Sequence, residues 1–269
     1  MKIRIRRTAA MLALSLATAG AWAQKAPAYQ PTVGQEGKDV VWVPTPQSLV
    51  DRMLEMAQVT PQDYLVDLGS GDGRTVITAA KRGVRAHGVE FNPDLVALSR
   101  KAAQDEGVSK TATFEQGDIF KTDFSQATVV TLFLLPQLNL RLRPILLDMK
   151  PGTRVVSNSF NMDDWAPDET AEAGGDCVNY CNAYKWVVPA KVQGSWQLQG
   201  KRLTLEQRFQ KLEGNLHDGG DAIRLREARL EGARIAFVAG GDRYVGEVDG
   251  DTIAGTVNGS GRWSATRIR

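Results

Sequence analysis

The chain has 269 residues, of which 42% are hydrophobic and 24% are charged, a composition typical of one large globular domain or two modest ones. Its net charge is only +2. A balance this close to neutral argues against a nucleic-acid-binding protein or a membrane-surface protein, so we expect no nucleic-acid partner.

Residues 1–23 have the pattern of a secretory signal peptide. A basic segment at residues 2–7 precedes an apolar run at residues 9–19, which is too short to span a bilayer comfortably. Residues 21–23 read Ala-Trp-Ala and place small side chains where a signal peptidase cleaves, which predicts cleavage before Gln24. We therefore expect an exported, periplasmic protein without a stable membrane span after cleavage. The alternative is an N-terminal membrane anchor.

The segment that follows alternates between strand and helix patterns, after a polar tether predicted at residues 24–39. This alternation over residues 40–190 predicts an α/β fold, a Rossmann-like doubly wound parallel sheet with helices on both faces. Strands are expected at residues 64–67, 86–89, 111–115, 128–134 and 153–160, and helices at residues 47–57, 75–81, 93–105 and 138–149.

The end of this α/β segment is less regular. Pro144 is expected to bend or split the last helix. Residues 167–176 are polar and acidic, which predicts a loop, and residues 184–188 are a further strand candidate at the sheet's edge.

The remaining residues, 194–269, predict a separate β-rich domain. Short alternating apolar runs are separated by glycine-rich turns, and the boundary falls at residues 189–194. The pattern predicts a small antiparallel meander, either a barrel or a sheet curled over its own core. Turns are expected at residues 218–220, 231–232, 240–242, 249–251 and 258–261.

The two cysteines, Cys177 and Cys181, are close in sequence. A helical turn would bring their Cα atoms to about 6 Å, within reach of a disulfide. An exported protein would favour the disulfide, with two free buried thiols, or metal or redox chemistry, as alternatives. A metal site would need two more ligands, so none is expected.

A glycine-rich turn joins the first strand of the α/β segment to its following helix. Gly69 and Gly71 lack a Cβ, so the backbone can approach a ligand closely, and N–H groups at the helix start can face an anionic group. Gly73 lies one position too early for the dinucleotide pattern G-x-G-x-x-G. The string D-L-G-S-G-D-G instead resembles the first motif of class I S-adenosylmethionine-dependent methyltransferases. The residues expected to bind this cofactor are Asp67, Gly69, Ser70, Gly71, Asp72 and Gly73.

Polar residues at later strand ends fit the same ligand. Glu90 ends the second strand about 20 residues after the glycine turn, the spacing at which a carboxylate can accept both ribose hydroxyls. Asn92 then starts the next helix. Asp118 and Ile119 follow the third strand, where methyltransferases of this class usually hold adenine. Dinucleotide binding and a plain structural turn remain alternatives.

A closer resemblance covers residues 40–165. The matching segments are V-P-T-P at residues 43–46, D-L-G-S-G-D-G-R at 67–74, G-V-E-F-N-P at 88–93, L-P-Q-L at 135–138, R-V-V-S-N-S-F at 154–160, and Trp165. They resemble the small protein-lysine methyltransferases that include the ATP synthase c-subunit methyltransferases.

The resemblance implies roles for two groups of residues. Pro44, Thr45 and Pro46 would lie over the cofactor, and Leu135, Pro136 and Gln137 would line the acceptor channel. The alternative for both groups is purely structural, as a helix N-terminus and an apolar strand end.

The function that follows is in-line transfer of a methyl group from S-adenosylmethionine, to a lysine of a protein or to a small-molecule acceptor. No catalytic base is predicted, because His87 is expected to be packed or exposed. Two other functions stay open. One is an exported, non-catalytic binding or scaffold module that keeps the methyltransferase fold, and the other is a protein for a different nucleotide-like ligand.

Overall fold

A computed structural model describes residues 29–269 of the chain, and residues 31–269 form one compact unit. The predicted signal peptide and the first residues of the predicted tether lie outside the described residues. Within residues 29–269, no helix has the length and apolar character needed to cross a membrane.

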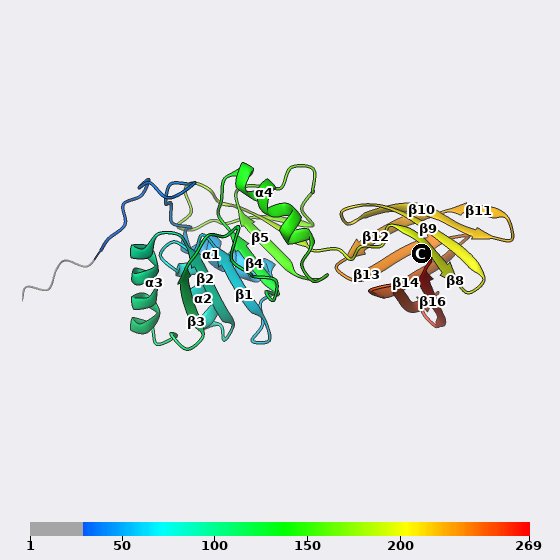
Figure 1. The fold of residues 1–269 in the computed structure, drawn as a ribbon, viewed down its shortest axis with the longest axis horizontal. Helices are drawn as coiled ribbons and strands as arrows, with labels where there is room; N and C mark the ends of the chain where they lie inside the picture. Colours follow the sequence, from blue (N-terminus) through cyan, green and yellow to red (C-terminus); the bar gives the residue numbers. More distant parts are fainter. Residues whose placement is uncertain (1–28) are drawn as a thin grey trace, which may run out of the picture. The chain divides into compact units, whose positions relative to one another are not determined.

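Seven strands form a mixed sheet in the order β3-β2-β1-β4-β5-β7-β6. Figure 1 shows the parallel part, β3-β2-β1-β4-β5. Strands β1 to β5 run parallel to one another, and β7 runs antiparallel to both β5 and β6. From β1 the chain builds the sheet first on one side, through β2 and β3, and then on the other side, through β4 and β5. The strand order therefore reverses between β1 and β4, and a crevice forms at the carboxyl ends of these two strands. The strands are β1 (Tyr64–Leu68), β2 (Arg85–Glu90), β3 (Ala112–Gln116), β4 (Val129–Leu132), β5 (Arg154–Asn158), β6 (Glu169–Glu172) and β7 (Asn182–Val187).

The edge of this sheet differs from the prediction in two ways. The acidic stretch expected to be a loop contains β6, and β7 lies inside the sheet, where it runs against the parallel direction. Strand β6 has the sequence Glu-Thr-Ala-Glu, and its side chains alternate between half-buried and exposed. Its backbone pairing with β7 therefore forms the strand without an apolar pattern that the sequence could reveal.

Helices cover both faces of the sheet (Figure 1). Helices α1 (Gln47–Met56), α2 (Arg74–Lys81) and α3 (Pro93–Asp105) bury their apolar stripes in one core, and α4 (Pro136–Leu147) packs in the core on the other face. Helix α4 stays one helix with Pro144 inside it, so the predicted split is wrong. Helix α3 starts as expected, with Pro93 in its first turn and the Asn92 side chain accepting a hydrogen bond from the Asp94 amide.

The C-terminal segment is a closed antiparallel barrel of eight strands, and β11 (Asp221–Arg224) extends one of them. Strand β8 pairs with both β9 and β16, which closes the ring. The expected turns all connect neighbouring strands. The eight strands are β8 (Gly194–Leu198), β9 (Lys201–Arg208), β10 (Lys211–Asp218), β12 (Arg226–Glu231), β13 (Arg234–Ala239), β14 (Asp242–Asp249), β15 (Thr252–Val257) and β16 (Gly261–Arg267).

Large side chains fill the barrel interior. Trp196, Phe237, Tyr244 and Trp263 are at most 5% exposed, and the ring centroids of Phe237 and Tyr244 lie 4.8 Å apart. An eight-stranded barrel is just wide enough for its own side chains to fill it. The barrel therefore has a packed core of its own.

Candidate active site

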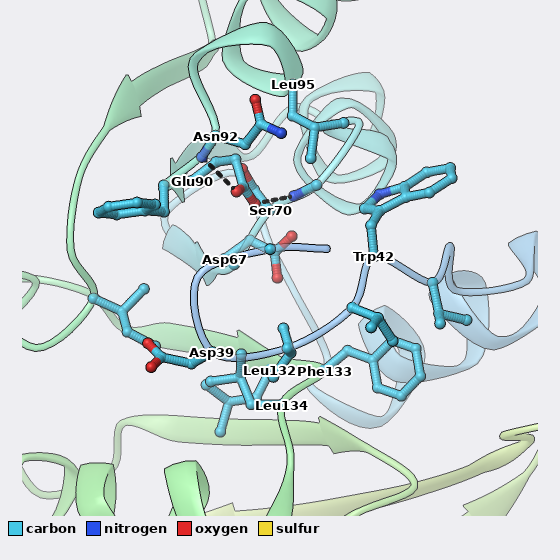
Figure 2. Close-up of a pocket in the computed structure, with 18 of the residues that line it drawn as sticks. Asp39, Trp42, Asp67, Ser70, Glu90, Asn92, Leu95, Leu132, Phe133 and Leu134 are labelled. Atoms are coloured by element: carbon cyan, nitrogen blue, oxygen red, sulfur yellow. Dashed lines mark hydrogen bonds between the residues drawn. The ribbon is translucent and has the colours of Figure 1, made fainter. Parts of the chain in front are cut away.

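A cavity of about 460 Å³ opens at the carboxyl ends of the parallel strands. Its walls come from the glycine turn, from the ends of β2 to β5, and from the segment that precedes α1. Figure 2 shows Asp67 near the middle of the pocket, with Glu90 and Asn92 on one side and Phe133 and Leu134 on the other. A cavity of this size suits a nucleoside-sized ligand.

Glu90 holds the glycine turn in shape. One carboxylate oxygen of Glu90 accepts a hydrogen bond from the Gly71 amide at 2.9 Å, and the other accepts one from the Asn92 amide at 2.9 Å (Figure 2). Gly71 has φ +54°, and a methyl group there would lie 2.8 Å from Trp42 Nε1. The turn therefore needs glycine both for its backbone conformation and for the close approach of Trp42.

Asp67 is a buried acid in the middle of the pocket. It is 7% exposed, and Oδ1 accepts a hydrogen bond from the Thr131 hydroxyl at 2.6 Å. The pKa of Asp67 is raised to about 7, mainly by burial and to a smaller extent by the nearby carboxylates of Glu90 and Asp72, while the hydrogen bond from Thr131 acts in the opposite direction. A cationic ligand in this pocket would be attracted by the ionised form.

The glycine turn also contains a polar side chain, that of Ser70. Its hydroxyl is buried and has no hydrogen-bond partner within residues 29–269. Gly88 makes the space for it, because a Cβ at Gly88 would lie 2.5 Å from Ser70 Oγ. Ser70 lines the cavity, but its hydroxyl has almost no exposed surface and packs on the Gly88 and Phe114 side of the turn, so it points into the fold and not into the cavity.

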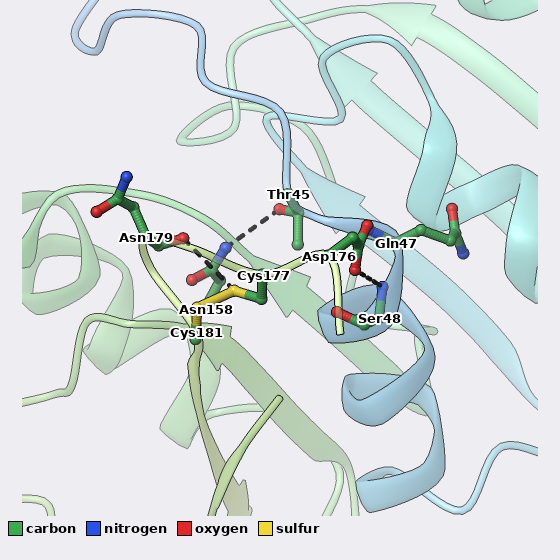
Figure 3. Close-up of a disulfide and its surroundings, with 8 residues drawn as sticks. All are labelled: Thr45, Gln47, Ser48, Asn158, Asp176, Cys177, Asn179 and Cys181. Carbon is green, nitrogen blue, oxygen red and sulfur yellow. Dashed lines mark hydrogen bonds between the residues drawn. A yellow bond between two sulfur atoms is a disulfide. The ribbon is translucent and has the colours of Figure 1, made fainter. Parts of the chain in front are cut away.

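The segment before α1 is fixed at two points. The Arg74 guanidinium donates to the Thr45 carbonyl at 2.8 Å. The Asn158 side-chain amide donates to Thr45 Oγ1 at 3.2 Å (Figure 3). Pro44 and Thr45 line the cavity at this position, whereas Pro46 lies outside its lining.

Asp118 and Ile119 also line the pocket. The Lys38 ammonium donates to Asp118 Oδ2 at 2.8 Å, and the Phe120 amide donates to Oδ1 at 3.0 Å. The hydrogen bond from Lys38 is the largest of the causes that hold the pKa of Asp118 below its ordinary value. Asp118 is therefore a stable anion that a ligand's amine would share with Lys38.

Three further residues named from the sequence lie outside the lining of the cavity. Gly73 packs inside the fold, where a Cβ would lie 2.7 Å from the Phe114 ring, so glycine serves helix–strand packing there. Pro136 and Gln137 are exposed in the first turn of α4, and only Leu135 of that group lines the cavity. The chain turns into the helix at Leu135, which directs the next two residues away from the pocket.

Sequence reasoning missed part of the wall that precedes α1. Residues 35–39, expected to belong to a tether, line the cavity together with residues 40–43. Backbone hydrogen bonds from Gly34 to the Trp42 carbonyl and from Trp42 to the Gln35 carbonyl fold this segment back on itself. The only signal in the sequence was a tryptophan in a short apolar run, which is also typical of an ordinary strand.

Three aromatic residues form a second wall that the sequence did not reveal as a unit. Phe133 follows β4, Phe160 follows β5, and Tyr180 precedes β7, and all three line the cavity. The ring centroid of Tyr180 lies 5.4 Å from that of Phe133 and 6.0 Å from that of Phe160. We call these three residues the aromatic end of the pocket, and Asp67, Glu90, Asp118 and residues 69–71 the acidic end.

A disulfide joins Cys177 and Cys181, whose Cα atoms lie 5.7 Å apart (Figure 3). The segment between them is a loop, so the helical turn assumed in the spacing argument is wrong. Next to the disulfide, the Asp176 carboxylate accepts hydrogen bonds from the amides of Gln47 and Ser48 at 3.0 and 3.1 Å. Asp176 thereby caps α1, because Pro46 at the N-cap position has no capping side chain.

Comparison with known proteins agrees with this geometry. Residues 67–169 match the ANTKMT methyltransferase domain. A protein-lysine N-methyltransferase from Saccharolobus islandicus is 42% identical over 152 residues, which make up 55% of this chain and 94% of that protein. The ATP synthase c-subunit lysine N-methyltransferase of Rattus norvegicus is 41% identical over 138 residues, 51% of this chain, and the chain covers 63% of that relative.

A solved structure is similar as well. An RNA methyltransferase from Salinibacter ruber, crystallised with S-adenosyl-L-homocysteine, is 50% identical, with a TM-score of 0.52 over 56% of this chain and 96% of that one. Each of these similarities spans about half of the chain, and the residues that match the methyltransferase domain, 67–169, all lie in the α/β part. The α/β part carries the match, and through it the chain belongs to the family of S-adenosylmethionine-dependent methyltransferases that contains the ANTKMT domain.

Proposed function

We propose that this protein transfers a methyl group from S-adenosylmethionine to the side-chain amine of a lysine in a protein. The observation that carries the proposal is one continuous pocket with an acidic end for the cofactor and an aromatic end for the acceptor. The names of the relatives from Saccharolobus and rat support lysine as the acceptor.

The residues of the acidic end fit this cofactor. Asp67 lies where it can attract the cofactor's positive charge, and the ionised form would be favoured by that charge. Glu90 keeps lone pairs for ribose hydroxyls while it accepts hydrogen bonds from the amides of Gly71 and Asn92.

S-adenosylmethionine held at the acidic end would supply a methyl group on a sulfonium. The lysine ammonium would first lose a proton to solvent, and its neutral nitrogen would then take the methyl group as the bond to sulfur breaks, which gives a methylated ammonium and S-adenosylhomocysteine. The protein would contribute the alignment of the two reactants and a channel with little water. These two effects can lower the activation barrier by roughly several kcal/mol. The His87 ring shares a hydrogen bond with the Thr113 hydroxyl on the neighbouring strand, and His87 does not line the cavity. His87 therefore takes no part in the pocket.

A transfer assay with radiolabelled S-adenosylmethionine tests the proposal. Envelope extract from cells that lack this protein serves as the acceptor mixture, and acid hydrolysis followed by amino-acid analysis identifies the labelled residue. We expect label in methylated lysine, and much less of it with the Glu90→Ala variant at a low concentration of S-adenosylmethionine. Label in another residue would contradict the lysine assignment.

The Salinibacter relative named as an RNA methyltransferase favours RNA as a second candidate acceptor. The same assay separates the two, because protease should release label from a protein acceptor and ribonuclease should release label from RNA. The net charge of +2 favours the protein, since RNA binding relies on many basic contacts to phosphate.

The proposal includes action outside the cytoplasm, in the periplasm. It is supported by the signal-like pattern of residues 1–23 and by the disulfide beside the pocket, since disulfides persist in oxidising compartments. The intact acidic end favours catalysis over a scaffold role. Cell fractionation should find the protein in the periplasm, and recovery in the cytoplasm with reduced cysteines would contradict this part.

A further inference from the structure

We propose that Tyr180, held in place by the Cys177–Cys181 disulfide, is a specificity-determining residue that forms the outer wall of the acceptor-amine site. The inference deepens the proposed function and rests on it. It concerns the loop of residues 174–181, a segment beyond the residues that match the methyltransferase domain.

The sheet topology brings this loop to the pocket. Strand β7 runs antiparallel to β5, so the start of β7 lies at the same edge of the sheet as the carboxyl ends of the parallel strands. Ala183 pairs with Asn158, and the Ser159 amide donates to the Asn182 carbonyl at 2.7 Å. Tyr180 therefore reaches the pocket directly beside the segment that carries Phe160.

The loop is fixed at both of its ends. The disulfide fixes it at the start of β7, and the Asp176 carboxylate fixes it at the first amides of α1 (Figure 3). Tyr180 has φ +59°, a backbone conformation that residues other than glycine rarely adopt. The two attachments restrain the loop in this conformation and, together with the ring contacts to Phe133 and Phe160, keep Tyr180 at the pocket.

The chemistry of the wall selects the ligand. Tyr180 as a residue is 48% exposed, and its ring meets that of Phe133 at an interplanar angle of 61°, so the two rings present differently oriented faces and edges to the cavity. Aromatic faces attract an ammonium group, and their apolar surface accepts the alkyl chain that carries it. A lysine side chain offers both features, whereas a neutral alkyl chain offers only the second.

A pair of bisubstrate probes tests this without knowledge of the natural acceptor. Both are S-adenosylhomocysteine analogues in which nitrogen replaces sulfur and carries a chain of equal length. The chain ends in a primary amine in one probe and in a methyl group in the other. Calorimetric titration of the full chain measures its affinity for both probes and for S-adenosylhomocysteine itself.

For Tyr180→Ala we expect the affinity for the amine probe to fall about tenfold, the affinity for the alkyl probe to fall less, and the affinity for S-adenosylhomocysteine to stay within about twofold. Tyr180→Phe should retain most of the affinity for the amine probe. In the double variant Cys177→Ser with Cys181→Ser, the affinity for the amine probe should fall about three- to tenfold, because the loop is freed while the Tyr180 ring is kept.

Val178 provides the matched control. It lies in the same loop, is 85% exposed and does not line the cavity, so Val178→Ala should change none of the three affinities. An unchanged affinity of Tyr180→Ala for the amine probe, or an equal loss for S-adenosylhomocysteine, would overturn the inference. Equal losses for the two probes would overturn amine selection. If the unaltered protein failed to bind S-adenosylhomocysteine at all, the proposed function itself would fall.

Discussion

The two ends of the pocket differ in what holds them in place. The acidic end is built within the sheet, where Glu90 accepts hydrogen bonds from the glycine turn and Asp67 is fixed by Thr131. The aromatic end is assembled from three separate segments, and one of them depends on a disulfide loop. The difference indicates that the cofactor site is a rigid property of the fold, whereas the acceptor site can vary with the loop that is added to it.

The largest loss of cofactor affinity is expected when a side chain is added to the glycine turn. Gly71→Ala should lower the affinity for S-adenosylhomocysteine about 100-fold, because the added methyl meets Trp42 and the residue must keep a positive φ. Calorimetry measures the loss. Gly107→Ala is the matched control, since Gly107 has φ +71° and open space around it, so that variant should share the backbone strain and keep the affinity. Wild-type affinity in Gly71→Ala would contradict the close packing of the turn.

Removal of the Glu90 carboxylate should have the next largest effect. Glu90→Ala frees the amides of Gly71 and Asn92 together, and charged hydrogen bonds of this kind are each worth about 1.5–3 kcal/mol. We expect about 30-fold weaker binding of S-adenosylhomocysteine by calorimetry, with bisubstrate binding reduced in parallel. Glu90→Gln keeps one acceptor oxygen and should lose less. A variant that weakens only the bisubstrate probes would mean that the two ends are not separate.

The buried acid should make cofactor binding depend on pH. The pKa of Asp67 is raised to about 7, so its carboxylate is mostly protonated at pH 6 and mostly ionised at pH 8. Since the cationic ligand favours the ionised form, the affinity for S-adenosylmethionine should rise about tenfold from pH 6 to pH 8, with release of a proton on binding. Titrations in two buffers of different ionisation enthalpy measure the proton. Asp67→Asn should flatten this profile, and an affinity that falls as the pH rises would contradict the assignment.

Loss of Asp118 should have the smallest effect at the acidic end. Its carboxylate is partly exposed and already paired with Lys38, so Asp118→Ala should lower the affinity for S-adenosylhomocysteine by about threefold to fivefold. Lys38→Ala leaves the carboxylate free for the ligand and should weaken binding less than Asp118→Ala. The melting temperature should hardly change in either variant, because exposed ion pairs contribute about 0–1 kcal/mol to stability. A larger effect for Lys38→Ala would show that the lysine itself contacts the ligand.

The same contrast explains what the sequence could predict. The glycine turn and the strand-end acids follow one another along a regular strand–helix alternation, so their meeting at one edge of the sheet follows from the parallel topology. Asp67, Glu90 and Asp118 all line the cavity, as do Asn92 and Ile119. Gly73 shows the limit of this reasoning, because a glycine in a binding motif can serve packing against Phe114 instead.

The aromatic end could not be predicted in the same way. Tyr180 reaches the pocket only because β7 runs against the other strands and because the loop before it is closed by a disulfide. Strand β6 lies in the preceding acidic stretch and carries no apolar pattern. The wall formed by residues 35–43 likewise depends on contacts across the fold, which local patterns do not encode.

A calorimetric titration of the purified protein with S-adenosylmethionine and with S-adenosylhomocysteine tests the central claim most directly, that this pocket binds the methyl donor. We predict one molecule bound per chain for each ligand, with affinities in the micromolar range and a loss of binding in Gly71→Ala. The absence of binding by either ligand at millimolar concentration would contradict the claim.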